Sequence, residues 1–235
     1  MRSILLKFSG PLQSWGTDSH FETRETDLYP SKSGVIGLVA ACLGYGRDED
    51  ENISSLNSLS FAVRIDRPGL LLHDYQIARK YKANGEQEQI YVTNRYYLED
   101  AIFLVVLSHE NNAMIDEIEE ALRFPYFTPS LGRRSVPIPA EFILAKLDQD
   151  ALSLLHDYPW QGDEKGGRYT PTKLTIYSDS DLMSDDNPSR LRRDLVLSFS
   201  YKERQYGFRS ESRGEMRLAP QSATEEHDAF AALED

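Results

Sequence analysis

The residues best placed to hold an anion lie in the segment YPSKSGVIGLVAACLGYG, residues 29–46, where Lys32 stands between two serines. A P-loop requires a glycine directly before the lysine and another five positions earlier. Ser31 and Thr26 occupy those positions, so the spacing argues against triphosphate binding. A helix N-terminus still offers free backbone N–H groups to a phosphate, and Lys32 would add a cation. Alternatively, Ser31 or Ser33 caps the helix and the lysine is solvated. These residues alone leave both interpretations open.

A second candidate site is the segment PGLLLHDYQIARKYKANGEQEQIYVTNRYY, residues 68–97. Asn84-Gly85 is a strong hairpin-turn signal, and the flanking residues alternate between polar and apolar. The segment therefore predicts a projecting β-hairpin. Interleaved basic and aromatic residues suit a nucleic-acid backbone with unstacked bases, although they could also form a solvated hairpin with tyrosines packed at its base. The basic residues are Arg79, Lys80, Lys82 and Arg95, and the aromatic ones are Tyr75, Tyr81, Tyr91, Tyr96 and Tyr97.

A third candidate is the proline-bounded segment YFTPSLGRRSVPIP, residues 126–139. Gly132 would let the backbone approach a ligand closely. Arg133 and Arg134 suit bidentate hydrogen bonding to phosphate, and Ser135 adds a hydroxyl. The alternative is an ordinary helix-to-strand loop with exposed arginines.

The sequence predicts no metal or cofactor site. Cys42 is the only cysteine, which excludes an internal disulfide and a cysteine-based zinc site; in its apolar run we expect a buried, inert thiol. The five histidines show no paired metal-ligand spacing such as HxxxH. His73, followed by Asp74 and Tyr75, could act as a general base on an RNA 2′-OH, but nothing else marks a catalytic centre.

The net charge of −12 argues against nucleic-acid binding by the chain as a whole. The charge is uneven, however, because residues 187–217 hold eight basic residues and only four acidic ones. The local field, and not the total charge, decides what a groove attracts. With no signal peptide and no apolar segment of membrane-spanning length, we expect a soluble cytoplasmic protein that makes no membrane contact.

The elements that must position these residues follow the order strand, helix, strand, strand, helix, strand. Strands are expected at 3–8, 60–66, 101–108 and 141–147, and helices at 32–43 and 111–124. Gly44 can end the first helix, whose small face would sit close against a sheet. This order predicts an α+β fold of the ferredoxin-like or RRM-like type, a common platform for single-stranded RNA.

The chain is expected to divide into a ferredoxin-like domain, residues 1–147, and a β-rich C-terminal extension, residues 148–220. The hairpin of residues 68–97 would be an insertion in the first part. The extension would hold a short helix at 148–158 and strands at 169–177 and 195–208. Residues 221–235 carry five acids and no base, which predicts an acidic tail.

Three motifs, in this order, resemble the type I-E branch of the Cas-five family of CRISPR-associated proteins, within the RAMP superfamily. They are GPLQSWG at 10–16, followed by Phe21 and Arg24; PSKSGVIGLVAACLG at 30–44; and YFTPSLGRRSVP at 126–137. The similarity covers about residues 1–140 and continues more loosely to the C-terminal strands.

This resemblance implies a non-catalytic subunit of Cascade, the RNA-guided surveillance complex. Such a subunit would bind the 5′ handle of the crRNA and cap a filament of CasC backbone subunits, while its hairpin, the thumb, displaces a nucleotide at the handle–spacer junction. Further partners would be the large subunit CasA and, through the assembled complex, target DNA. In a type I-C relative the family cuts precursor crRNA, so a metal-independent endoribonuclease is the alternative function.

By motif position, the resemblance implies three groups of RNA-binding residues. Trp15 could instead be a core or loop-anchoring residue. The hairpin candidates rest on the residue pattern alone, because the hairpin shows no motif match. The groups implied by the motifs are Gln13, Trp15 and Arg24; Ser31, Lys32 and Ser33; and Arg133, Arg134 and Ser135. The hairpin candidates are Tyr75, Arg79, Lys80, Lys82, Tyr91 and Arg95.

Overall fold

A computed structural model describes residues 1–16, 22–162 and 171–218 of the chain, so the expected acidic tail lies outside the described residues. The elements in chain order are β1 (Arg2–Ser9), β2 (Leu12–Gln13), β3 (Thr23–Arg24), α1 (Lys32–Leu43), α2 (Asp50–Ser55), η1 (Leu56–Ser58), β4 (Ser60–Arg67), β5 (Leu70–Tyr81), β6 (Gln87–Glu99), β7 (Ile102–His109), α3 (Asn112–Arg123), β8 (Ile143–Leu147), α4 (Ala151–Asp157), β9 (Lys173–Asp179), η2 (Ser180–Leu182), β10 (Ser189–Ser198) and β11 (Gln205–Arg217).

The main sheet has seven strands in the order β10-β11-β9-β4-β7-β1-β8. All neighbouring pairs are antiparallel. The four strands expected in the first part of the sequence, β1, β4, β7 and β8, lie side by side in it. β7 is apolar along most of its length because both of its faces are covered, and seven of its eight residues are buried.

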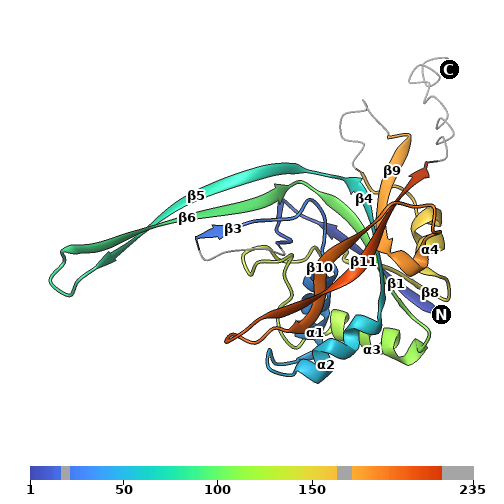
Figure 1. Cartoon of the computed structure of the whole chain (residues 1–235), viewed down its shortest axis with the longest axis horizontal. Coiled ribbons are helices and arrows are strands. Elements are labelled where there is room, and N and C mark those ends of the chain that lie inside the picture. Colours follow the sequence, from blue (N-terminus) through green and yellow to red (C-terminus); the bar gives the residue numbers. More distant parts are fainter. Residues whose placement is uncertain (17–21, 163–170, 219–235) are drawn as a thin grey trace, which may run out of the picture.

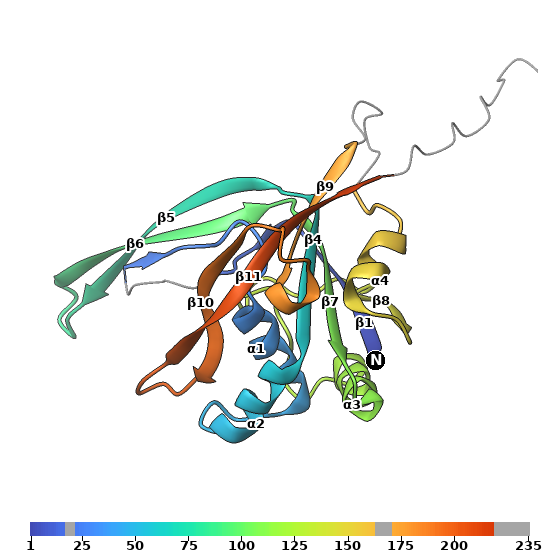
Figure 2. The same cartoon turned by 45° about the vertical axis from the view of Figure 1, so that its right-hand side comes forward.

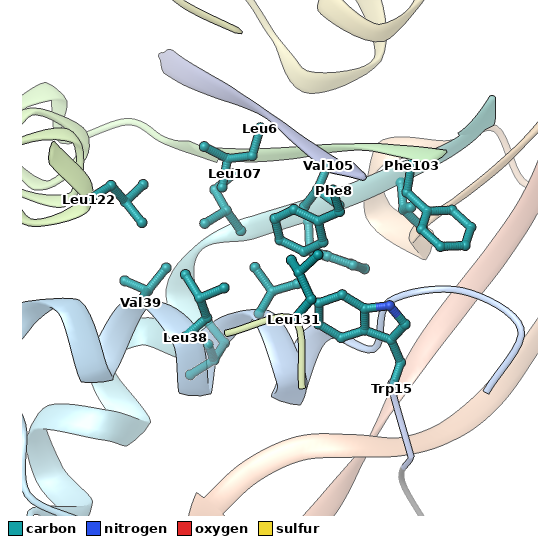
Figure 3. Packing of buried hydrophobic residues seen from close by; sticks show 14 of the residues in the cluster. Leu6, Phe8, Trp15, Leu38, Val39, Phe103, Val105, Leu107, Leu122 and Leu131 are labelled. Atoms are coloured by element: carbon teal, nitrogen blue, oxygen red, sulfur yellow. The ribbon is translucent and has the colours of Figure 1, made fainter. Parts of the chain in front are cut away.

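Two apolar layers cover the two faces of this sheet. On one face, side chains of β1, β4 and β7 pack against α1 and α3, and Trp15 and Leu131 close the end of this cluster (Figure 3). On the other face, α4 packs through Ala151, Leu154 and Leu155. Because residues along a strand alternate between faces, Leu6 and Phe8 belong to the first cluster and Leu5 to the second.

Helix α1 begins and ends where the sequence predicts. The Ser31 hydroxyl accepts a hydrogen bond from the backbone N–H of Gly34 at 3.2 Å, and Gly44 ends the helix at a φ of 85°. A Cβ on Gly34 would lie 3.1 Å from the Trp15 ring, and one on Gly37 would lie 3.3 Å from Phe199. The small face of α1 therefore accommodates two aromatic side chains.

The segment expected to form a hairpin is the pair β5 and β6, which extends away from the body of the molecule (Figure 1). The two strands pair from Leu70 opposite Glu99 to Tyr81 opposite Gln87, and Gly85 in the turn has a φ of 83°. The short strands β2 and β3, which the sequence did not predict, pair with β6 near the root of the hairpin.

The prediction of a single strand over residues 195–208 was wrong. This stretch contains a chain reversal between β10 and β11, which pair with each other (Figure 2). The Ser198 hydroxyl accepts a hydrogen bond from the backbone N–H of Ser200 at 3.1 Å, which stabilises the reversal. Strands β9 and β11 of the expected C-terminal extension continue the main sheet beside β4.

The helices in the described ranges are all too short or too polar to cross a membrane.

Candidate nucleic-acid interface

Three segments that are distant in the sequence meet at the root of the hairpin. β3 runs parallel to β6, which places Arg24 beside Arg95. The backbone N–H of Ser14 donates to the Leu131 carbonyl at 3.1 Å, and the Ser14 hydroxyl donates to the Tyr96 carbonyl at 3.3 Å. The first loop, the hairpin root and the glycine-containing loop thus form one surface.

Arg133 joins these segments through its side chain. Its guanidinium donates to the Arg24 carbonyl at 3.0 Å and to the Tyr96 carbonyl at 3.3 Å. The same group lies over the Tyr97 ring, 4.4 Å from the ring centre, a distance suited to a cation–π interaction. These contacts fix the guanidinium without neutralising its charge.

We call Arg24, Arg95, Arg133 and Arg134 the arginine surface. Arg24 and Arg134 are exposed, and the other two are half-buried. Within the described part of the chain, no carboxylate lies within ion-pair distance (4.0 Å) of any of the four. In the register of the sheet, Arg95 lies between Arg24 on β3 and Asp74 on β5. Asp74 offsets part of the positive charge, and the exposed Arg24 and Arg134 are the groups best placed to bind an anion. Ser135, also exposed, follows Arg134.

Gln13 and Trp15 do not lie on this surface, which corrects the expectation that their side chains contact RNA. Gln13 is 0% exposed; its amide donates to the carbonyls of Phe8 and Ala101 and accepts from the Trp15 indole at 3.0 Å. The Trp15 ring stacks on Phe8, with 5.0 Å between ring centres. Both residues support the surface from within the core.

Lys32 and its two serines are also buried, which corrects their expected role as a phosphate site. Lys32 is 4% exposed. Its ammonium donates to Asp179 at 2.9 Å and to the Asn57 carbonyl at 3.1 Å. Its backbone N–H, which a phosphate would need, donates to Asp194 at 2.9 Å. The Ser33 hydroxyl bonds to the capping hydroxyl of Ser31.

Lys32 belongs to a buried group of charges that we call the ion cluster: Lys32, Asp179, Arg192, Asp194, Arg209 and Glu211. Arg209 donates to Asp194, Asp179 and Glu211 at 2.7–3.1 Å. Arg192 donates to Glu211 and to Asp27. Burial alone would raise the pKa of Glu211, but Arg192 and Arg209 lower it below its usual value.

The basic span of residues 187–217 is therefore only partly a surface feature. Two of its arginines, Arg192 and Arg209, are each 8% exposed and neutralise buried carboxylates. They also connect the segment before α1 with β9, β10 and β11, because Arg192 lies over the Tyr29 ring at 4.5 Å and the Tyr29 hydroxyl donates to Glu211 at 2.7 Å. Within this span the buried arginines are matched by the buried Asp194 and Glu211, so the excess of positive charge counted in the sequence is carried by the six exposed basic residues.

The hairpin candidates project into solvent, but the charges near the tip are balanced. Lys80 pairs with Glu88 at 2.9 Å and Lys82 with Glu86 at 3.6 Å. Arg79 has no such partner among the described residues. Tyr75 is exposed, and so is Tyr91, whose hydroxyl donates to Gln89 at 2.6 Å. Of the four basic residues of the hairpin, Arg79 and Arg95 are left without an ion pair in the described ranges, and only Arg95 lies near the root, beside Arg24.

His73 lies at the root as well, next to the arginine surface. Its ring stacks on Tyr96 with 4.6 Å between ring centres, and its Nε2 lies 2.8 Å from the Asn94 side-chain oxygen. Tyr96 stacks on His73 and Tyr97 lies under Arg133, but the sequence did not predict either tyrosine as a site residue. The sequence signal for them was that both belong to the aromatic residues of the hairpin segment.

Comparison with known proteins gives a consistent result. Residues 3–210 match the family model described as CRISPR-associated protein (Cas_Cas5). The chain is 35% identical over 182 residues, 69% of this chain and 80% of the relative, to the "CRISPR system Cascade subunit CasD" of Escherichia coli (strain K12). The solved structure titled "CRISPR RNA-guided surveillance complex" contains a similar chain, with a TM-score of 0.76, 30% identity, and coverage of 92% of this chain and 90% of that one. "Crystal structure of Cas protein" matches with a TM-score of 0.66, 32% identity, and coverage of 92% and 94%.

Proposed function

This chain belongs to the Cas5 family of CRISPR-associated proteins, and from that premise we propose that it is a non-catalytic, cytoplasmic subunit of a Cascade-type complex. In this role it binds the 5′ handle of the crRNA. Its protein partners are the CasC backbone subunit, whose filament it caps, and the large subunit CasA. It meets target DNA through the assembled complex.

The observation that supports handle binding is the arginine surface. Arg24, Arg95 and Arg133 come from three separate segments, and none of them forms an ion pair with a carboxylate in the described ranges. Four guanidinium groups without an ion pair match a phosphate backbone, because arginine binds phosphate through charge-assisted hydrogen bonds. A net charge of −12 is compatible with this role, since one basic surface can meet RNA while other faces meet protein.

The fold is consistent with the proposal. We interpret the order β4-β7-β1-β8 with α1 and α3 on one face as a ferredoxin-like domain of the RAMP type. We assign β5 and β6 as the thumb, which would displace a nucleotide at the handle–spacer junction. The exposed Tyr75 and Tyr91 provide aromatic rings on it, and unstacked bases can stack on such rings.

Replacing Arg24 and Arg134 with methionine is expected to reduce crRNA retention. Both side chains are exposed, so the chain should fold normally while it loses two phosphate contacts. In a complex co-expressed with the partner subunits and crRNA, we expect at least about a tenfold loss of RNA affinity. The plot of log affinity against log salt concentration should become shallower by about 1.4. RNA content and salt dependence of the purified complex measure both effects.

The matched control is Arg213→Met, which removes an exposed arginine of β11 that has no ion-pair partner in the described part of the chain. This variant should retain crRNA like the wild type. Equal retention by the double variant and the wild type would place the handle elsewhere.

The alternative function, a metal-independent endoribonuclease, is supported by the position of His73 next to the arginine surface. The test is incubation of the full chain with repeat RNA in EDTA. Under the non-catalytic proposal the RNA stays intact. Specific cleavage that is lost in His73→Ala would show the enzyme instead.

A further inference from the structure

A second positively charged site lies on the opposite face of the sheet from α1 and α3. It is a pocket of about 410 Å³ lined by Lys7, Ser9, Arg67, Ile102, Trp160, Gln161 and Gly162. Ser9 pairs with Ile102, and Ile102 pairs with Arg67, so three adjacent strands form the floor. Lys7 lies opposite Leu104, a member of the apolar cluster under α4, which places Lys7 on the same face.

The wall of the pocket is held by a fully buried ion pair. Arg64 and Asp66 are joined by two hydrogen bonds of 2.7 and 2.9 Å. Arg64 also donates to the carbonyls of Leu155, Tyr158 and Pro159. Asp66 accepts from the backbone N–H of Gln161 at 2.6 Å, and its carbonyl accepts from the Trp160 indole at 3.0 Å. The segment after α4 is thus fixed over the sheet.

The two cations of the pocket keep unused donors. Lys7 donates once, to the neutral Gln161 side chain at 3.1 Å, and Arg67 uses Nε for the Asp100 carbonyl at 2.5 Å. Neither forms an ion pair within the described ranges. Arg64 neutralises the carboxylate of Asp66, so among the described lining residues the pocket has two positive charges, those of Lys7 and Arg67, without an ion pair. Buried or confined charges of one sign favour a counter-ion, here an anion.

The aromatic lining narrows the class of ligand. Trp160 is only partly buried, and its ring packs so closely against Gly162 that a Cβ there would overlap it. A fixed indole next to two cations suits a base together with its phosphate. The volume also lies in the range of small-molecule sites. We propose that this pocket binds one nucleotide unit, with its phosphate on Lys7 and Arg67 and its base on Trp160.

This site is distinct from the arginine surface, and its existence does not depend on the proposed function. The chemistry is that of a phosphorylated nucleoside, which can come from a nucleic-acid strand or from a free nucleotide. Pocket and arginine surface share no residue, although Arg67 precedes β5 and Ile102 follows β6. A strand bound at the root of the hairpin could therefore reach the pocket.

Intrinsic fluorescence of the full chain tests the proposal. The chain has two tryptophans, and Trp15 is buried in the other cluster, so quenching by a stacked base should report on Trp160. We expect adenosine 5′-monophosphate to quench at concentrations at least about tenfold lower than adenosine, which lacks the phosphate. Trp160→Phe should abolish the response.

Charge removal provides the second measurement. Lys7→Met together with Arg67→Met should weaken quenching by the monophosphate about tenfold or more. Arg123→Met, which removes an exposed cation of α3, should leave it unchanged. Single-stranded octanucleotides of RNA and DNA show whether the ligand is part of a strand or a free nucleotide. Binding tighter than that of the monophosphate indicates a nucleic-acid strand, and weaker binding indicates a free nucleotide. Equal quenching by adenosine and its monophosphate in the wild type would overturn the proposal, whether or not the double variant folds.

Discussion

An Arg209→Met chain is expected to lose about 3–5 kcal/mol of its free energy of unfolding, the usual cost of removing one partner of a buried ion pair. Arg209 donates to three carboxylates, those of Asp179, Asp194 and Glu211. Methionine fills similar space but leaves these acids with less compensating charge inside the protein. Because small domains are stable by only about 5–15 kcal/mol, much of the stability would be lost. Urea unfolding of the full chain measures the change.

Two further variants show whether the effect comes from the ion cluster. Arg213→Met removes an exposed arginine from the same strand and should cost less than about 0.5 kcal/mol. Adding Asp194→Asn to Arg209→Met removes one of the carboxylates that the first change leaves without its arginine. The double variant should therefore lose less free energy of unfolding than the sum of the losses in the two single variants. If the losses in free energy of unfolding were strictly additive, the charges of the ion cluster would not be energetically coupled, contrary to this prediction.

The ion cluster also explains why Lys32 could not be interpreted from its neighbours. The spacing of residues 26–32 was sufficient to argue against a P-loop, and the helix and its cap were predictable from local residues. The two carboxylates that bind Lys32, however, lie on strands 147 and 162 residues later in the chain. The same local sequence is compatible with a lysine exposed to solvent and with a lysine buried in an ion pair. Only the tertiary fold distinguishes the two.

Local signals predicted the elements with a strong periodicity or turn. The apolar β7, the amphipathic α3 and the Asn84-Gly85 turn all occur where expected. The stretch 195–208 failed because the polar residues of its reversal, Ser198 and Ser200, also fit an alternating strand. β2 and β3 have two residues each, too few for any periodicity, and they form because β6 is beside them.

Local sequence signals also predicted part of the candidate site. Motif positions identified Arg24, Arg133 and Arg134, and the hairpin pattern identified Arg95, which together form the arginine surface. Gln13 and Trp15 belong to the same motif but point into the core. A motif predicts which segment contributes to a site. The burial of each side chain in the fold then decides whether it can contact a ligand or only supports the residues that do.

Gly132→Ala is expected to disturb the arginine surface from within. Gly132 has a φ of 88°, and a Cβ at this position would overlap the backbone carbonyl of Ser14. Because backbone on both sides must move, we expect a loss of about 3 kcal/mol or more in the free energy of unfolding. The neighbouring Arg133 would lose its position over Tyr97, so crRNA retention by the co-expressed complex should also fall.

Gly85→Ala separates the two causes of this loss. Gly85 has nearly the same backbone conformation, with a φ of 83°, but no atom lies within 4 Å of its hypothetical Cβ. It should therefore show only the cost of the left-handed conformation, about 1–2 kcal/mol, with crRNA retention unchanged unless the hairpin turn itself contacts RNA. If both variants lose the same stability, the approach of the glycine-containing loop to Ser14 is not what holds the arginine surface together. A larger loss in Gly132→Ala, with RNA released, would show that the backbone contact between the first loop and Gly132 positions the arginines.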